Sequence, residues 1–356
     1  MMIEPKRVAI AMSGGVDSSV SAALLKEAGY DVFGIMLRLW SPSPEIRNRC
    51  CSPEDLALAQ RVAAHLEIPF YALDVKEFFK ATVVQPFIDG YAQGITPNPC
   101  LNCNRLVRWG FLLDRALALG ATHMATGHYA RVQEADGEFL LLRGKDRLKD
   151  QSYILSVLNQ SQLKHAVFPL GEYEKGTVRQ LAIDFKLPVA DRGESQDLCF
   201  LGGMDYRTFL RGQATTLPLT GPIEDTLGNQ LGVHEGLAAY TIGQRKGIGI
   251  ASQEAYYVIQ KDTARNRLIV GRQSELGRDE FTVKDLNWIS GEAPLAPLQV
   301  LSRIRYKSRE VESTLYPEDQ GQLRVKLHES LREVTPGQAA VFYDGERCLG
   351  GGIISL

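Results

Sequence analysis

Residues 13–19, Ser-Gly-Gly-Val-Asp-Ser-Ser, have the composition of a phosphate-binding loop. Gly14 and Gly15 lack a Cβ atom, so backbone N–H groups can close around phosphate oxygens, and a helix that starts here points its positive end at the same anion. Asp17 would repel a phosphate unless it meets a magnesium ion or caps the helix. The lysine of the Gly-x-x-x-x-Gly-Lys-Ser/Thr loop is absent, which disfavours γ-phosphate transfer. A simple glycine turn before a capped helix is the alternative.

Two cysteines lie in segments that could carry sulfur chemistry. Residues 96–104 (Thr-Pro-Asn-Pro-Cys-Leu-Asn-Cys-Asn) form a loop stiffened by two prolines, and Cys103 lies near the start of a predicted helix. The helix dipole there lowers the pKa of a thiol and raises its thiolate content. Cys199 lies far along the chain, and nothing in the spacing brings the two together. Of the cysteines outside these two segments, Cys348 is expected to be a packed core residue, and Cys50 and Cys51 are expected to be solvent-facing thiols.

A strand–helix rhythm positions these loops. Short apolar runs and helical stripes alternate through the first half of the chain and predict an α/β fold with a doubly wound parallel sheet. The predicted strands are residues 8–12, 31–37, 70–75 and 122–126, and the predicted helices are residues 18–28, 55–66 and 105–119. After about residue 205, short alternating runs separated by turn signals predict small β domains.

Size and composition narrow the class of protein. A chain of 356 residues is too long for one core, and we divide it into domains at 1–205, 206–278 and 279–356. The N-terminus lacks the apolar stretch of a signal peptide, and no apolar run has the roughly 18 residues of a membrane helix, so we expect a cytoplasmic protein without membrane contact. Six cysteines in such a chain are not a disulfide framework. A monomer is the default expectation.

Nucleic-acid contact would have to come from local basic patches, because the formal net charge is −2. Alternating basic residues at 303, 305, 307 and 309 would share one face of a strand and form a phosphate track. Two further clusters are Arg245-Lys246 between glycines and the basic residues at 145, 147 and 149. The alternative for each is a solvated edge that resists aggregation.

Several blocks in one order resemble the bacterial tRNA-specific 2-thiouridylase (MnmA/TrmU) family of PP-loop ATP pyrophosphatases, essentially end to end. The blocks are residues 13–19, 96–99, 125–129 (Ala-Thr-Gly-His-Tyr), 149–153 (Lys-Asp-Gln-Ser-Tyr), 197–200 (Asp-Leu-Cys-Phe), 243–247 (Gly-Gln-Arg-Lys-Gly) and 336–343. The resemblance implies a PP-loop domain, a small mostly-β middle domain and a C-terminal β-barrel. It implies that ATP adenylates O2 of the tRNA wobble uridine, that a Cys199 persulfide supplies sulfur, and that Cys103 acts as the second thiol.

The resemblance also carries site residues onto this sequence. The ATP site it implies is Ala11, Met12, Ser13, Gly14, Gly15, Val16, Asp17, Ser18, Leu37 and Gly127. The target base would meet Asn98, Pro99 and Cys100. The implied tRNA contacts, to which the basic clusters add, are His128, Lys149, Asp150, Gln151, Arg245, Lys246, Arg305, Tyr306 and Gln338. The implied partners are tRNA with a wobble uridine (Lys, Glu and Gln tRNAs) and a cysteine desulfurase or sulfur-relay donor, with Mg²⁺ accompanying ATP.

One position departs from the family pattern. Many members have an acidic residue where this sequence has Cys100, so Cys100, Cys103 and Cys199 could hold three irons of a 4Fe–4S cluster. A Cys100–Cys103 disulfide and a zinc site completed by Cys50 or Cys51 are further alternatives. We favour the persulfide, because nothing in the sequence brings four ligands together. Two other classes stay open: a PP-loop synthetase acting on a small molecule, and a non-catalytic tRNA- or metal-binding protein.

Overall fold

The computed structural model describes residues 6–42, 52–193, 198–213 and 220–355. Its first part is built on a five-stranded parallel sheet in the order β3-β2-β1-β4-β7. The strands are β1 (Arg7–Ala11), β2 (Asp31–Arg38), β3 (Phe70–Asp74), β4 (His123–Ala125) and β7 (Ala166–Val167). The four predicted strands therefore exist and end within two residues of their predicted limits.

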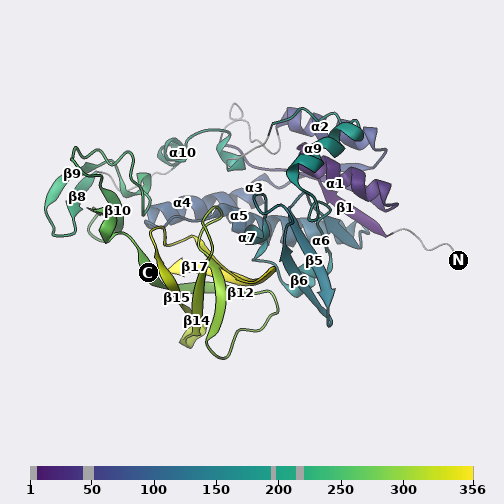
Figure 1. The fold of residues 1–356 in the computed structure, drawn as a ribbon. Coiled ribbons are helices and arrows are strands. Elements are labelled where there is room, and N and C mark those ends of the chain that lie inside the picture. Colours follow the sequence, from purple (N-terminus) through teal and green to yellow (C-terminus); the bar gives the residue numbers. More distant parts are fainter. Residues whose placement is uncertain (1–5, 43–51, 194–197, 214–219, 356) are drawn as a thin grey trace.

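Helices cover both faces of this sheet, which confirms the doubly wound α/β fold (Figure 1). Alternate residues of β1 enter two different cores, Val8 and Ile10 on one face and Ala9 on the other. The first core is completed by α1 (Val16–Glu27), α2 (Pro53–His65) and α9 (Lys175–Asp184). The second is completed by a continuous helical segment made of α5 (Pro99–Asn102), the π-helical turns η2 (Cys103–Leu112) and α6 (Leu113–Ala118).

That helical segment begins earlier than the sequence suggests. The predicted start was near residue 105, whereas helical backbone runs from Pro99, with Asn98 as its N-cap. Proline is well suited to the first helical turn, because its missing N–H would have no partner there in any case. The early start places Cys100 and Cys103 in the helix itself rather than in the loop before it.

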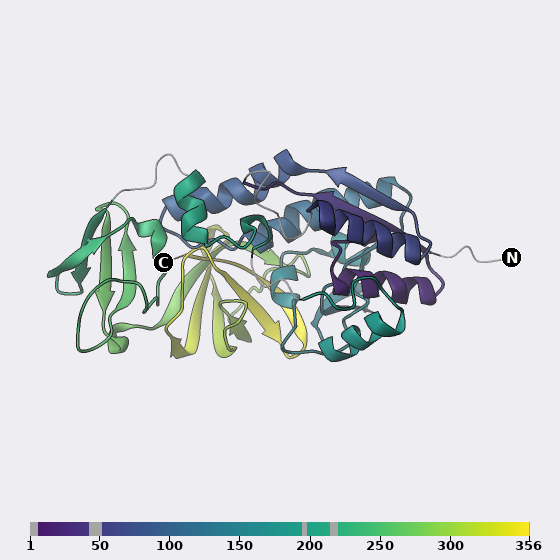
Figure 2. The same cartoon turned by 90° about the horizontal axis from the view of Figure 1, so that it is seen from above.

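A small middle domain follows α10 (Tyr206–Gln213). It is a four-stranded sheet in the order β10-β11-β8-β9, and Figure 2 shows it at the opposite end of the molecule from the parallel sheet. Its strands are β8 (Gly221–Asp225), β9 (Gln230–His234), β10 (Tyr257–Asp262) and β11 (Arg267–Gly271).

The C-terminal domain is a closed six-stranded β-barrel, because β12 pairs with both β15 and β17. The glycines of the last strand allow this closure: a Cβ atom on Gly350 would lie 2.0 Å from the Asn287 carbonyl oxygen. The strands are β12 (Arg278–Trp288), β13 (Leu298–Arg303), β14 (Val311–Pro317), β15 (Leu323–Leu331), β16 (Ala339–Asp344) and β17 (Arg347–Ser355).

A hairpin from the first part of the chain joins the barrel to the parallel-sheet domain. Strands β5 (Ala130–Ala135) and β6 (Glu138–Arg143) extend the barrel sheet beyond β17, with Cys348 opposite Leu141. Cys348 is fully buried in this junction, as expected for a packed core thiol. Among the described helices, none is long and apolar enough to cross a membrane.

The continuous strand predicted to carry the basic residues at 303–309 on one face is wrong. Strand β13 ends at Arg303, and the backbone then turns, with the Ser308 hydroxyl accepting from the Arg305 N–H at 3.1 Å. Alternation places side chains on one face only while the backbone stays extended. Arg303 instead lies 3.6 Å from buried Asp150, and Arg309 pairs with Glu329.

Candidate active site

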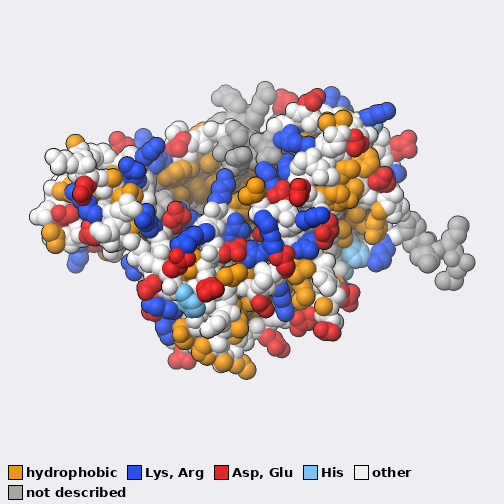
Figure 3. Space-filling view, in the orientation of Figure 1, with side chains coloured by type: hydrophobic (Ala, Val, Ile, Leu, Met, Phe, Trp, Pro, Cys, Tyr) orange, Lys and Arg blue, Asp and Glu red, His pale blue; other side chains and the backbone are white. Residues whose placement is uncertain are grey.

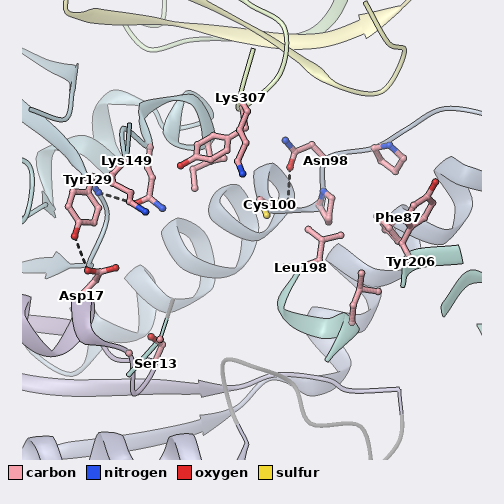
Figure 4. Close-up of a pocket in the computed structure, with 18 of the residues that line it drawn as sticks. Ser13, Asp17, Phe87, Asn98, Cys100, Tyr129, Lys149, Leu198, Tyr206 and Lys307 are labelled. Atoms are coloured by element: carbon pink, nitrogen blue, oxygen red, sulfur yellow. Dashed lines mark hydrogen bonds between the residues drawn. The ribbon is translucent and has the colours of Figure 1, made fainter. Parts of the chain in front are cut away.

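A cavity of about 930 Å³ runs between the carboxyl ends of the parallel strands and the barrel. Ligands of open α/β sheets bind at this edge. Figure 4 shows Ser13 and Asp17 at one end, Cys100 and Asn98 in the middle, and Phe87 and Tyr206 at the other end. The phosphate loop and the Asn98–Cys100 segment, which the sequence could not place together, therefore share one cavity.

The phosphate end is built from the turn between β1 and α1. Gly15 is the N-cap of α1 but has no side chain to cap it, so the first N–H groups of the helix face the cavity. The Ser18 and Ser19 hydroxyls both donate to the Gly15 carbonyl, at 3.2 and 2.8 Å, and the Ser13 N–H donates to Ser18 at 3.3 Å. This arrangement has the features of an anion site: helix N–H groups, a positive dipole end and hydroxyls.

Two glycines are required by close approach. Gly14 has a φ of +70°, and a Cβ atom there would lie 2.6 Å from the Asp55 carbonyl oxygen. A Cβ atom on Gly127 would lie 2.8 Å from the Ser18 nitrogen. Gly127 therefore packs directly against the first turn of α1. This close approach leaves no room for a side chain at position 127, which is one of the predicted ATP-site residues.

The negative charge of Asp17, which would repel a phosphate, is balanced by neighbouring side chains. Its Oδ1 accepts from the Tyr129 hydroxyl at 2.8 Å and from the Lys175 ammonium at 2.6 Å. Lys175 is the first residue of α9 and also lines the cavity. The phosphate loop has no positively charged residue of its own, and Lys175, which lies 158 positions from Asp17 in the sequence, supplies this positive charge.

Arg192 fixes the loop from the other side. Its guanidinium donates to the Gly14 carbonyl at 2.7 Å and forms an ion pair with Asp55, whose side chain is only 5% exposed. Asp55 is in turn part of the capping box that starts α2, with Ser52. The main-chain path of the phosphate loop is thus tied to the helix beside it.

The segment predicted to meet the target base is held by the barrel. The Asn98 side chain accepts from the Cys100 N–H at 3.1 Å, and the Gln338 amide donates to the Thr96 carbonyl at 2.7 Å. The Thr96 N–H donates to the Pro336 carbonyl at 2.9 Å. Gln338, predicted to contact tRNA, therefore also positions residues 96–100, and Asn98, Pro99 and Cys100 all line the cavity.

Cys103 and Cys199 are half-buried beside the other end of the cavity. Both pack against an aromatic cluster that contains Phe79, Phe87, Phe200 and Phe209. Neither lines the cavity wall, whereas Leu198 and Leu201, on either side of Cys199, do so, and Figure 4 shows Leu198 close to Cys100. Within the described ranges, no three His, Cys, Asp or Glu side chains are placed to hold a metal ion. Cys50 and Cys51 lie outside those ranges.

The residues predicted to contact tRNA fall into two groups. Lys149, Gln151, Tyr306 and Gln338 line the cavity. The others lie away from its wall: Arg245 and Lys246 in a separate depression of the middle domain, and Asp150, His128 and Arg305 at buried or half-buried positions.

The buried members of the second group have structural partners. Asp150 accepts from the Gly144 N–H at 3.0 Å and the Ser152 hydroxyl at 2.8 Å. The His128 ring lies 2.7 Å from the Thr126 hydroxyl, and burial, helped by Arg108, lowers its pKa well below the ordinary value. A neutral, enclosed ring has almost no surface to offer tRNA in this conformation.

The predicted ATP residues surround the same end of the cavity. Ser13, Gly15, Val16 and Asp17 line it. Ala11 is the last residue of β1 and Met12 follows it, Ser18 is buried behind the wall, and Leu37 is partly buried in the neighbouring strand β2.

The sequence analysis missed three basic residues that line the cavity. Lys175, Arg179 and Arg192 come from segments without a motif of their own. Lys307, which also lines the cavity, was named only as part of the basic track, and Tyr129 was named only as part of a recognised block. Charge alone could not single out the three, because exposed lysines and arginines occur along the whole chain.

Three family models cover nearly the whole chain. The tRNA methyl transferase HUP domain matches residues 6–203, the tRNA methyl transferase PRC-barrel domain residues 207–272, and the aminomethyltransferase beta-barrel domain residues 278–354. The tRNA-specific 2-thiouridylase MnmA of Magnetococcus marinus is 45% identical over 357 residues, covering 99% of this chain and 100% of the relative. This chain belongs to the tRNA-specific 2-thiouridylase family.

Further relatives agree with that assignment. The 2-thiouridylase MnmA of Moorella thermoacetica is 46% identical over 351 residues, covering 97% of this chain and 98% of the relative. Among solved structures, a 4-thiouridine synthetase–RNA complex with bound ATP is 14% identical, with a TM-score of 0.38, over 58% of this chain and 50% of that one. That last likeness is too distant to add weight. The 2-thiouridylase family assignment rests on the full-length relatives.

Proposed function

We propose that this protein is an ATP-dependent tRNA-uridine 2-sulfurtransferase that makes 2-thiouridine at the wobble position. The observation that carries the proposal is the shared cavity: one space holds the phosphate loop, the Asn98–Cys100 segment and Lys149. The same cavity favours thiolation over methyl transfer, although two matching family models are named for methyl transferases. The usual sulfonium methyl donor has no phosphate to occupy the loop at Ser13, and methyl transfer needs no thiol.

The first step activates a poor leaving group. Uridine O2 attacks the α-phosphorus of ATP, the α–β bond breaks, and pyrophosphate leaves. The N-terminus of α1 and the hydroxyl of Ser13 stabilise the phosphates, and Ser18 holds the loop through its bonds to Ser13 and Gly15. The target base lies in a single-stranded loop, where it can be turned out of the stack cheaply and reach the wall formed by Asn98 and Pro99.

The second step replaces oxygen with sulfur. The terminal sulfur of a Cys199 persulfide attacks C2, and AMP leaves with the former O2. The Cys103 thiolate then attacks Cys199 Sγ and breaks its bond to the transferred sulfur, which stays on C2 as 2-thiouridine while a Cys103–Cys199 disulfide forms. Alternatively, Cys103 attacks the persulfide first and releases hydrosulfide as the nucleophile. Both routes end in a Cys103–Cys199 disulfide that an external thiol must reduce. The half-buried position of both cysteines beside one aromatic cluster supports this pairing.

Magnesium would accompany ATP and neutralise phosphate charge. Asp17 is the carboxylate placed to hold it, because it lies at the phosphate end and is about one-third exposed. The 4Fe–4S alternative through Cys100, Cys103 and Cys199 has no support in the described residues, since no three-ligand group is formed there.

The remaining partners are part of the proposal. The substrate is tRNA with a wobble uridine, expected to be the Lys, Glu and Gln tRNAs. Sulfur comes from a cysteine desulfurase or a sulfur-relay protein. We expect a cytoplasmic monomer.

The decisive experiment is thiolation of unmodified tRNA with ATP, Mg²⁺ and a persulfide donor, followed by mass analysis of the nucleosides. Wild type should form 2-thiouridine and release pyrophosphate. Cys199→Ser should lose thiolation while it still releases pyrophosphate on adding tRNA. Thiolation that survives in Cys199→Ser would rule out the persulfide.

A companion experiment separates the persulfide from the cluster. Cys100→Ser should keep thiolation within about tenfold, whereas Cys103→Ser should lose it, because a persulfide route uses Cys103 but not Cys100. A cluster route needs all three ligands equally. Iron and sulfide analysis of anaerobically purified, active protein gives the independent check: an iron-free active enzyme excludes the cluster.

A further inference from the structure

We propose that helix α9 carries a cationic clamp, Lys175 and Arg179, that binds the β- and γ-phosphates of ATP and the pyrophosphate that leaves. The inference rests on the proposed function and deepens it, because it assigns the binding residues of one product.

The phosphate loop cannot balance the charge of a pyrophosphate by itself. Residues 13–19 contain no lysine, arginine or histidine, and Asp17 adds a negative charge. Backbone N–H groups and a helix dipole supply only partial charges. A leaving group with several full negative charges therefore needs cations from another part of the chain.

Lys175 lies where such a cation is needed. Its ammonium is 2.6 Å from Asp17 Oδ1, and its side chain is only 13% exposed. It lines the cavity together with Ser13 and Gly15. A largely buried ammonium needs an anionic partner, and Asp17 fills that role until a phosphate group arrives.

Arg179 extends the clamp along the same helix. It follows Lys175 by four residues, which places both side chains on one face of α9, and both line the cavity. An arginine offers two parallel N–H donors to a phosphate, whereas a lysine acts as a point charge, so the pair can hold two adjacent phosphoryl groups.

The clamp is held in place by the packing of its helix. Val178 and Ala182 of α9 are buried in the core that also contains α1, so the two helices keep a fixed relation. The Lys175 N–H donates to Asp146 Oδ2 at 3.0 Å, which fixes the first turn. Arg192, a further cation at this end, is engaged with the Gly14 carbonyl and Asp55 and shapes the loop instead.

The test measures binding of ATP, AMP and inorganic pyrophosphate by calorimetry with the full-length protein. Lys175→Met should weaken ATP and pyrophosphate binding by about 10- to 100-fold, because a charge-assisted contact to phosphate is lost, and AMP binding by less than about threefold. Lys175→Arg should retain most pyrophosphate affinity. Lys164→Met, on an exposed position of helix α8 (Gln160–Lys164), is the matched control and should change none of the three.

Arg179→Met gives a second, independent measurement. It removes a half-exposed cation without leaving Asp17 unpaired, so it serves even if Lys175→Met fails to fold. We expect it to weaken pyrophosphate binding by about 5- to 20-fold. Equal losses for ATP and AMP, or unchanged pyrophosphate affinity in both variants, would overturn the clamp. Thiolation by the wild-type protein is measured in a separate assay. If thiolation were absent, the proposed function would be refuted, whereas the binding measurements would still test the clamp.

Discussion

The two ends of the cavity are built differently. At the phosphate end, Asp17, Lys175 and Tyr129 are joined by hydrogen bonds, and Arg192 ties the loop to α2. At the sulfur end the walls are largely apolar and aromatic, and the two cysteines assigned to the chemistry lie just behind them.

The difference matches the demands of the two steps. Stabilising phosphates requires donors that already point at the charge, since reorganisation during the reaction would remove their advantage. In the proposed mechanism, Cys199 must meet a sulfur donor first and a tRNA base afterwards. Lys and Arg side chains, interspersed with Asp and Glu, lie over the middle of the face shown in Figure 3.

The largest expected effect is a difference in alkylation rate between buried Cys348 and the cysteines at the sulfur end. It tests whether reagents reach the sulfur-end thiols in the folded protein. Burial raises the pKa of Cys348 to about 12. Only the thiolate reacts, so at pH 8 Cys348 should be alkylated by iodoacetamide about a thousandfold more slowly than an ordinary thiol with a pKa near 8.5. Its rate should still rise about tenfold per pH unit above pH 9, where ordinary thiols level off. Peptide mass mapping gives the rates.

Half-buried Cys100, Cys103 and Cys199 should be modified well before Cys348. If Cys348 reacted as fast as those three in folded protein, the distinction between core and sulfur-end thiols would be lost. Wild-type circular dichroism at each pH is the control for folding.

The next largest effect addresses the prebuilt phosphate end. In Gly127→Ala, the new Cβ atom would lie 2.8 Å from the Ser18 nitrogen and 2.9 Å from the Asp17 carbonyl carbon, so the first turn of α1 must move. We expect ATP affinity to fall about 100-fold, the scale of two charge-assisted hydrogen bonds. Gly176→Ala, where a Cβ atom meets nothing within 4 Å, should bind ATP normally. An unchanged ATP affinity in Gly127→Ala would mean that the phosphate end is not rigid.

The two ends also differ in how far the sequence predicted them. Motif residues such as Gly14, Asp17 and Asn98 were found because each belongs to a short continuous block. Lys175 was missed because its role depends on a contact with Asp17 across 158 residues, which leaves no local pattern. The basic residues at 303–309 were misread for the opposite reason. Their alternation is a local pattern typical of a strand, but the backbone turns at Arg305–Ser308, so the side chains do not share one face.

Fold prediction shows the same division. Four of the five parallel strands were found from apolar runs, which depend on local composition, whereas the two-residue strand β7 was too short to be found this way. The extension of the barrel by β5 and β6 was not predicted, because pairing of Leu141 with Cys348 joins segments that lie far apart in the sequence. The function could be predicted from short blocks of sequence. Only the structure shows how these blocks come together around one cavity.

A smaller effect tests what holds the phosphate loop. Arg192→Met leaves the Asp55 carboxylate, which is only 5% exposed, without its cation. We expect the free energy of unfolding to fall by about 2 kcal/mol, because a buried charge then lacks its partner. Urea unfolding measures it, and Arg61→Met at an exposed position of α2 is the control. An unaltered unfolding curve for Arg192→Met would show that the loop is held by other contacts.

The smallest effect concerns communication between the phosphate end and the cavity rim at Leu148 and Lys149, where we propose that tRNA binds. Asp146 Oδ1 accepts from the Leu148 and Lys149 N–H groups, and Oδ2 accepts from the Lys175 N–H at 3.0 Å. Asp146→Asn keeps one acceptor oxygen. That oxygen can accept from the Leu148 and Lys149 N–H groups or from the Lys175 N–H group, but not from both sides. We expect a non-hydrolysable ATP analogue to raise tRNA affinity about fivefold in wild type and less than twofold in Asp146→Asn. Fluorescence anisotropy with and without the analogue measures this ratio. Equal ratios would mean that the two ends bind independently.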